Sequence, residues 1–179
     1  MGKMGSFKAP DMKRLQKQLD KIKDSDMDAF VEGCAKELAA RLLAKVIKRT
    51  PVGDYSGASY TCASGEQHKG YKVKGKKGGT LRRGWTAQQS RSGSEGLKTN
   101  GAKQYVDSLK INHYGGFLVI EIVNPVEYAS YVEFGHRTAS HKGWVRGHFM
   151  LTISEQEIQA IAPKVLEAKI KKFLGECMK

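Results

Sequence analysis

The apolar repeat between residues 30 and 47 restricts the fold more than any other stretch of the chain. Apolar side chains recur there at steps of three and four residues, at Phe30, Val31, Cys34, Leu38, Leu42, Val46 and Ile47. This spacing places them along one stripe of an α-helix. Ser25 offers a capping hydroxyl before the repeat, and Pro51 after Thr50 ends it because proline has no N–H to donate. The sequence predicts a long amphipathic helix in which Cys34 is a buried apolar residue rather than a reactive thiol.

A second apolar pattern of helical period lies near the C-terminal end. Its members are Ile158, Ile161, Val165, Leu166, Ile170, Phe173 and Leu174. Ser154 followed by Glu157 is typical of a capping box, so we expect the helix to begin there. Pro163 falls inside the pattern and removes a backbone donor, so we expect the helix to be kinked or split near Pro163.

The middle of the chain has the composition of β-strands. Residues 105–112 and 117–123 are rich in strand formers and are separated by a segment ending in two glycines, which predicts a hairpin. Residues 117–123 are apolar on both alternating faces, so we expect a central or doubly covered strand. Residues 81–90 are predicted to start another strand. The predicted fold class is α+β, with an antiparallel β-sheet of three or four strands packed against the N-terminal and C-terminal helices.

Length and composition predict a single folded domain. A chain of 179 residues can bury a substantial core. We expect residues 1–11 to form a flexible arm, and residues 12–179 to form one α+β domain that opens with a short basic helix and carries a basic loop insertion at about 53–79. No apolar run approaches the roughly 20 residues that cross a bilayer, and the N-terminus lacks the apolar core of a signal peptide. We therefore expect a soluble protein without a membrane partner.

The charge of the chain requires that an acidic partner be considered. The formal net charge is +13, and no aspartate or glutamate occurs between Gln67 and Ser94. Two interpretations of this segment stay open, a solvated mobile loop and a patch that contacts phosphates. The candidate basic patch, facing either DNA or an acidic neighbour, consists of Lys72, Lys74, Lys76, Lys77, Arg82 and Arg83.

Residues 123–150 combine aromatic, charged and turn-forming side chains more densely than any other segment. We expect a short helical turn with Tyr128, Val132 and Phe134 near one face, a chain reversal at Gly135, and then an exposed loop around Trp144. Exposed loops on a rigid base often carry contact functions. The candidate subunit interface consists of Tyr128, Tyr131, Glu133, Phe134, Arg137, Trp144 and Arg146.

No arrangement of residues predicts catalysis. A nucleophile with a base, paired carboxylates and a phosphate-binding glycine loop are all missing from the sequence. His136, His141 and His148 share one segment, but their spacing favours exposed or interface histidines over metal ligands. Glu133 lies between apolar neighbours, so we expect an ion pair with Arg137 or Arg82 rather than acid–base chemistry. The sequence predicts a protein that is not an enzyme and that binds no cofactor or metal.

Several short motifs in a fixed order resemble one protein family. The first group is Arg49, Thr50, Pro51 and Val52, and the second is Gly79, Thr80, Leu81, Arg82 and Arg83. After the predicted hairpin come Val123 with Asn124, Tyr128 with Ala129, Val132 to Gly135, and finally Phe149 with Met150. Across residues 29–174 this order resembles the neck or tail-completion proteins of long-tailed bacteriophages, the lambdoid-type head–tail joining family. The chain departs from the family at Gly53 and Asp54, and about 25 residues separate the first two groups.

The resemblance implies a non-enzymatic structural protein of the virion, assembled in the cytoplasm of the bacterial host. It implies a ring of identical copies in the phage neck, between the head connector or stopper proteins and the tail terminator or tail tube proteins. Two alternatives stay open at this point. The first is that the chain is a tail terminator of the same structural class, and the second is that it is a stand-alone basic nucleic-acid-binding protein.

Overall fold

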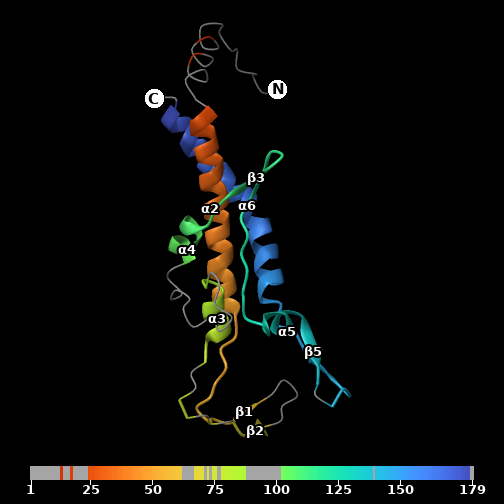
Figure 1. The fold of residues 1–179 in the computed structure, drawn as a ribbon. Helices are drawn as coiled ribbons and strands as arrows, with labels where there is room; N and C mark the ends of the chain where they lie inside the picture. The colour runs from red at the N-terminus through yellow and green to blue at the C-terminus, as the bar shows by residue number, and fades with distance from the viewer. Residues whose placement is uncertain are drawn as a thin grey trace, which may run out of the picture.

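Two long helices run side by side through the molecule (Figure 1). The computed structural model describes residues 13, 17, 24–61, 67–70, 72, 74–75, 78–87, 102–138 and 140–177. Helix α2 (Asp24–Arg49) and helix α6 (Met150–Cys177) are antiparallel. The rings of Phe30 and Phe173 stack at 4.4 Å near one end of the pair, and Arg49 Nη2 lies 2.7 Å from Glu157 Oε1 near the other. Both predicted long helices are confirmed, and Cys34 is buried as a free thiol.

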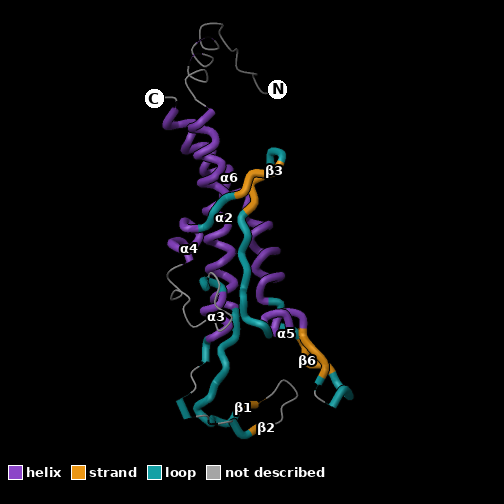
Figure 2. Tube along the Cα trace, in the orientation of Figure 1, coloured by secondary structure: helices purple, strands orange, loops and turns teal. Residues whose placement is uncertain are grey.

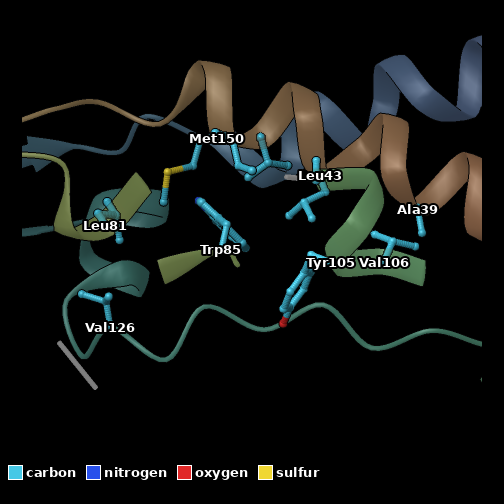
Figure 3. Packing of buried hydrophobic residues seen from close by; sticks show 11 residues of the cluster. Ala39, Leu43, Leu81, Trp85, Tyr105, Val106, Val126 and Met150 are labelled. Carbon is cyan, nitrogen blue, oxygen red and sulfur yellow. The ribbon is translucent and has the colours of Figure 1, made fainter. Parts of the chain in front are cut away.

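The core lies where short helices pack against α2 (Figure 3). Helix α3 (Thr80–Gly84) and helix α4 (Ala102–Ser108) bring their apolar residues to one side of α2, and the start of α6 closes the cluster. Its buried members are Ala39, Leu43, Val46, Ile47, Leu81, Trp85, Ala102, Tyr105, Val106, Val126 and Met150. Burial of a Leu or Met side chain contributes roughly 1.5–3 kcal/mol, so this cluster is the main source of apolar stabilisation among the described residues.

The end of α2 is fixed by side chains from α3. Thr50 is fully buried, and its hydroxyl donates to the Val46 carbonyl at 2.7 Å. Trp85 Nε1 donates to the Thr50 hydroxyl at 2.8 Å, and the Arg82 guanidinium donates twice to the Thr50 carbonyl, at 3.1 and 2.7 Å. Terminal helix carbonyls have no partner within their own helix. Arg82 in α3 and Trp85 directly after it therefore provide hydrogen-bond donors that the groups at the end of α2 lack within their own helix.

The α+β class is confirmed, but the predicted sheet of three or four strands is wrong. Figure 2 shows short separate hairpins instead. In the described part of the chain, β1 (Tyr60–Thr61) pairs with β2 (Gln67–His68), and β3 (Asn112–Tyr114) pairs with β4 (Phe117–Val119). The third pair is β5 (Gly135–Arg137) with β6 (Trp144–Arg146). All three pairs are antiparallel, and the helices rather than a sheet supply the framework.

Two predicted strands are helices. Residues 80–84 form α3, and residues 102–108 form α4 where a strand from residue 105 was expected. Leu81 and Trp85 are four residues apart, a spacing that puts both on one face of a helix and also on one face of a strand. Tyr105 and Val106 are both buried against α2 although they are adjacent, which a helix permits and an exposed strand does not.

The predicted hairpin in the middle of the chain is confirmed in a shorter form. Tyr114 pairs with Phe117 around a two-residue turn of Gly115 and Gly116, both with positive φ. Beyond β4, residues 120–126 continue as an extended segment beside the helices (Figure 2). Ile120 and Ile122 pack on the core, whereas Val119 and Val123 are exposed. The expectation of a central strand covered on both faces is therefore wrong for the described residues.

Helix α6 begins four residues before the predicted capping box and continues through Pro163. The alternative of two successive helices is wrong. Ser154 lies inside the helix, fully buried, where its hydroxyl donates to the Met150 carbonyl at 2.6 Å and accepts from Arg49 Nη1 at 2.7 Å. A capping box needs a free Ser hydroxyl at the helix start, and this hydroxyl serves the contact between α2 and α6 instead.

Several sequence predictions fall outside the described residues. These are the flexible arm at residues 1–11 and most of the basic helix expected before Asp24. Of the basic loop insertion, Lys76 and Lys77 are likewise outside. No helix in the described part of the chain combines the length and apolar character needed to span a membrane.

We predict that Glu157→Gln lowers the thermal stability of the protein near neutral pH. Hydrogen bonds from Lys45 Nζ at 2.5 Å and from Arg49 Nη2 at 2.7 Å lower the pKa of Glu157 in the folded protein. A depressed folded pKa stabilises the protein above the unfolded pKa, and this stabilisation is lost as the pH falls through the folded pKa. The Tm difference between wild type and Glu157→Gln should therefore shrink in acid, measured by calorimetry over a pH series. Glu155→Gln, an exposed neighbour, is the control, and a pH-independent Tm difference would contradict the prediction.

Candidate subunit interface

Helix α5 (Ala129–Phe134) presents aromatic side chains on the surface of the molecule. Tyr128, Tyr131 and Phe134 are 45%, 58% and 62% exposed. The expected apolar face of Tyr128, Val132 and Phe134 is wrong in part, because only Val132 of these packs against the core. Glu133 is the buried residue of the helix, 5% exposed. The α5 surface is thus more apolar toward solvent than the sequence pattern predicts.

Glu133 caps the start of α6. Its carboxylate accepts hydrogen bonds from the backbone N–H groups of Leu151 and Thr152, both at 2.9 Å, and from the Thr152 hydroxyl at 2.8 Å. The first N–H groups of a helix have no partner in the helix, and the helix dipole favours a negative charge beside them. The backbone carbonyl of Glu133 also accepts from Phe149 N at 3.0 Å. We call these contacts the Glu133 clamp.

The predicted ion pair of Glu133 with Arg137 or Arg82 is wrong. The clamp provides hydrogen-bond donors to both oxygens of the buried carboxylate, and Arg82 is bonded to Thr50 instead. A buried carboxylate needs several donors to offset its lost hydration, and a helix N-terminus supplies them without a cation. Arg137 is exposed on β5 and leaves its charge at the surface.

The hairpin of β5 and β6 projects from the clamp, away from the helix pair (Figure 1). Gly135 makes the reversal with φ 87°, and a Cβ there would meet the Val145 carbonyl at 2.4 Å. Arg137 pairs with Trp144, which is 63% exposed, and Gly135 pairs with Arg146. The expected exposed loop around Trp144 is therefore a short hairpin. It carries an aromatic ring between two surface arginines.

A groove of about 560 Å³ separates this hairpin and α5 from the chain that follows α2. Its lining residues are Pro51, Val52, Gly53, Tyr55, Gly78, Gly79, Thr80, Leu81, Tyr128, Tyr131, Val132, His136, Val145, Arg146 and His148. No carboxylate belongs to this lining. Burial raises the pKa of the Tyr128 phenol, and the nearby Tyr55 raises it further while Arg83 lowers it. The rings of Tyr131 and His136 meet edge to face at 5.9 Å.

The candidate basic patch separates into two kinds of residue. Lys72 and Lys74 are exposed. Arg82 is bonded to the Thr50 carbonyl, and Arg83 Nη1 donates to the Gly78 carbonyl at 3.3 Å. Both arginines therefore have structural partners within the chain. Their charge still contributes to the field beside the groove, since neither contact involves a carboxylate.

The three histidines of the hairpin region do not gather into a metal site. His136, His141 and His148 are exposed, and no three potential His, Cys, Asp or Glu ligands come together anywhere in the described part of the chain.

Sequence reasoning missed two surface features, one in the groove and one at the other end of the molecule. Tyr55 lines the groove although it comes from a glycine-rich loop with no regular pattern. Phe117 and Tyr114, at the tip of the β3–β4 hairpin, are 75% and 62% exposed, but strand composition alone suggested burial. The two glycines between them were the only sequence signal that placed these rings at a hairpin tip.

We predict that Glu133→Ala destabilises the protein by about 1–3 kcal/mol, because helix donors and a buried site are left without an acceptor. Glu133→Gln keeps one acceptor oxygen and should have an intermediate effect. Glu155→Ala, an exposed residue in the first part of α6, should change stability by less than about 0.5 kcal/mol. Chemical denaturation of the three variants provides the comparison. Equal, negligible effects of the two alanine variants would show that Glu133 is solvated.

A family model described as "HK97-gp10_like: Bacteriophage HK97-gp10, putative tail-component" matches residues 13–135, about two thirds of the chain. The matched range includes α2, α3, α4, α5 and the Glu133 position, and it ends where the β5–β6 hairpin starts. Neither the curated proteins nor the solved structures contain a match. The chain belongs to the HK97-gp10-like family of bacteriophage tail components.

Proposed function

We propose that the chain is a structural protein of the phage neck, which forms a ring of identical copies and joins the head connector to the tail without catalysing a reaction. The observation that carries the proposal is the exposed aromatic surface of α5 and the β5–β6 hairpin, fixed to α6 by the Glu133 clamp. Aromatic and arginine side chains are enriched in the residues that dominate protein–protein binding energy. Membership of a tail-component family supports the same conclusion.

The proposed interface consists of the surface members of the predicted set, with Glu133 acting from beneath them. Tyr128, Tyr131, Phe134 and Trp144 offer apolar area, and Arg137 and Arg146 flank it with charge. A rigid base limits the entropy lost on binding, because the contacting side chains are already positioned. The proposed partners are copies of the chain, the head connector or stopper proteins, and the tail terminator or tube proteins.

Phage particles test this function. We predict that mass spectrometry detects the chain in purified particles, and that electron microscopy places it as a ring at the head–tail junction. Trp144→Ala with Tyr131→Ala should yield heads and tails that fail to join, because the interface loses its aromatic anchors. Ile170→Ala, an exposed apolar residue far along α6, is the matched control. Absence of the chain from particles would contradict the proposal, and a position at the far end of the tail would favour a terminator.

The nucleic-acid-binding alternative keeps support from the net charge of +13 and from the exposed Lys72 and Lys74. If six to ten phosphates are neutralised, affinity for duplex DNA should fall by about 10³–10⁵ between 50 and 200 mM salt. Lys72→Glu with Lys74→Glu should then weaken DNA binding, measured by fluorescence anisotropy, and should leave Tm unchanged. Lys164→Glu with Lys172→Glu on α6 makes the same charge change as a control. Wild-type protein without salt-dependent binding would remove this alternative.

A further inference from the structure

We propose that the groove beside α5 binds a neighbouring copy of the chain. The part of the neighbour that enters the groove is the tip formed by α2 and the β3–β4 hairpin, at the end of the molecule opposite to the groove. This inference rests on the proposed ring and names the two surfaces that would meet in it. Each surface has an apolar centre, and the charges around the two centres are opposite in sign.

The groove has a cationic setting. Four segments meet in its lining, residues 51–55, 78–81, 128–132 and 136–148, and no aspartate or glutamate is a lining residue. The segments 78–81 and 136–148 belong to stretches without acids, whereas Asp54 and Glu127 adjoin the other two. Arg146 lines the groove, Arg137 lies on the paired strand, and Arg83 acts on the groove tyrosine Tyr128. The nearest buried acid, Glu133, is occupied by the start of α6. The groove therefore favours an apolar group that arrives with negative charge.

The opposite end of the molecule carries such a group, which we call the acidic tip. Its apolar side chains are Phe117 and Tyr114 on the hairpin, with Met27 and Val31 on the first turns of α2, 44% and 43% exposed. Asp28, Val31 and Phe117 line one shallow depression there. The acids beside it are Asp28 and Glu32, and Glu32 is 3.2 Å from His113.

Among the described residues, two lysines of α6 near this end of α2 have partners of their own. Lys169 Nζ donates to the Gly33 carbonyl at 3.1 Å and lies 3.9 Å from Glu37, and Lys171 is paired with Glu167. The Lys169 contacts join α6 to α2, and the Lys171 pair lies on the exposed surface of α6. On the side facing the hairpin, the acids Asp28 and Glu32 adjoin the exposed rings.

The two surfaces are too far apart to meet within one copy. They lie near opposite ends of α2, whose 26 residues span about 39 Å. A contact between different patches of identical chains is heterologous, and it closes into a ring if its rotation is suitable. Burying an aromatic ring such as Phe117 in the groove removes about 150–250 Å² of surface from water. Duplex DNA has the required charge but no apolar side chain to fill a groove lined by tyrosine, valine and leucine.

Charge reversal on the two surfaces tests the contact. The groove variant combines Arg137→Glu with Arg146→Glu, and the tip variant combines Asp28→Lys with Glu32→Lys. Each variant places like charges against each other, so its self-association at low salt should weaken by at least about tenfold relative to wild type. When the two variants are mixed, the acidic groove of one can receive the basic tip of the other, and association should recover. Light scattering coupled to size exclusion measures the mass, and Tm checks the fold of each variant.

Two further measurements separate charge from apolar fit. Phe117→Ala should weaken association without a charge change, and the exposure of Phe117 makes a folding defect unexpected. Lys164→Glu with Lys172→Glu on α6 changes the net charge as the groove variant does, and it should associate as wild type does.

The contact is overturned if wild type stays monomeric at every concentration, if the charge-reversed variants associate as wild type does, or if mixing them restores nothing. Groove variants that keep self-association but lose DNA binding would assign the groove to DNA. If wild-type rings are found at the neck of particles and the charge-reversed variants associate as wild type does, the proposed function stands and only this contact is rejected. Absence of the chain from particles is the separate result that rejects the function.

Discussion

The carboxylate of Glu133 connects the two halves of the molecule. On one side lies the antiparallel pair α2 and α6, which together with α3 and α4 forms the apolar core. On the other lie α5 and the β5–β6 hairpin, whose side chains are mostly exposed. A two-stranded hairpin of this length is not stable alone in water. The position of the β5–β6 hairpin depends on how strongly the Glu133 carboxylate binds the start of α6, because the Glu133 clamp fixes the residues on both sides of the hairpin.

The other wall of the groove depends on a similar arrangement with reversed polarity. At the end of α2 the acceptor is the Thr50 carbonyl, and the donors are the Arg82 guanidinium together with the Trp85 indole acting on the Thr50 hydroxyl. A helix C-terminus favours a cation as the N-terminus favours an anion. One groove wall therefore follows the C-terminal end of α2, and the other lies at the N-terminal end of α6. Each of these helix ends is held by a charged side chain of suitable sign. Basic residues near the groove stabilise the fold as well as setting the local charge.

Long periodic segments could be predicted from sequence, and short ones could not. The repeat from Phe30 to Ile47 and its end at Pro51 located α2 correctly, because seven apolar positions agree on one period. Leu81 with Trp85 fits a helix and a strand equally well, and only the contact with the end of α2 decides between them. The run from Phe117 to Val123 alternates as a strand does, but whether a second strand lies beside it depends on the chain elsewhere.

The sequence predicted the exposure of some candidate interface residues but not the contacts that position them. The exposure of Trp144 followed from the composition of the segment around it, whereas the role of Glu133 depends on where α6 begins. Ser154 and Glu157 form a convincing start signal, yet both are used to bind Arg49 across the helix pair. A carboxylate eighteen residues before Leu151 provides the cap instead, and no local pattern reveals such a distant partner.

The antiparallel pairing of α2 with α6 has a consequence for synthesis. Lys45 and Glu157 are 112 residues apart, so the side of α2 that packs against α6 stays uncovered until much of α6 has left the ribosome. Until then Glu133 has no helix start to bind, and the hairpin after it has no fixed base. A nascent chain consequently cannot hold the aromatic side chains of α5 and the hairpin in their folded arrangement before the start of α6 has formed.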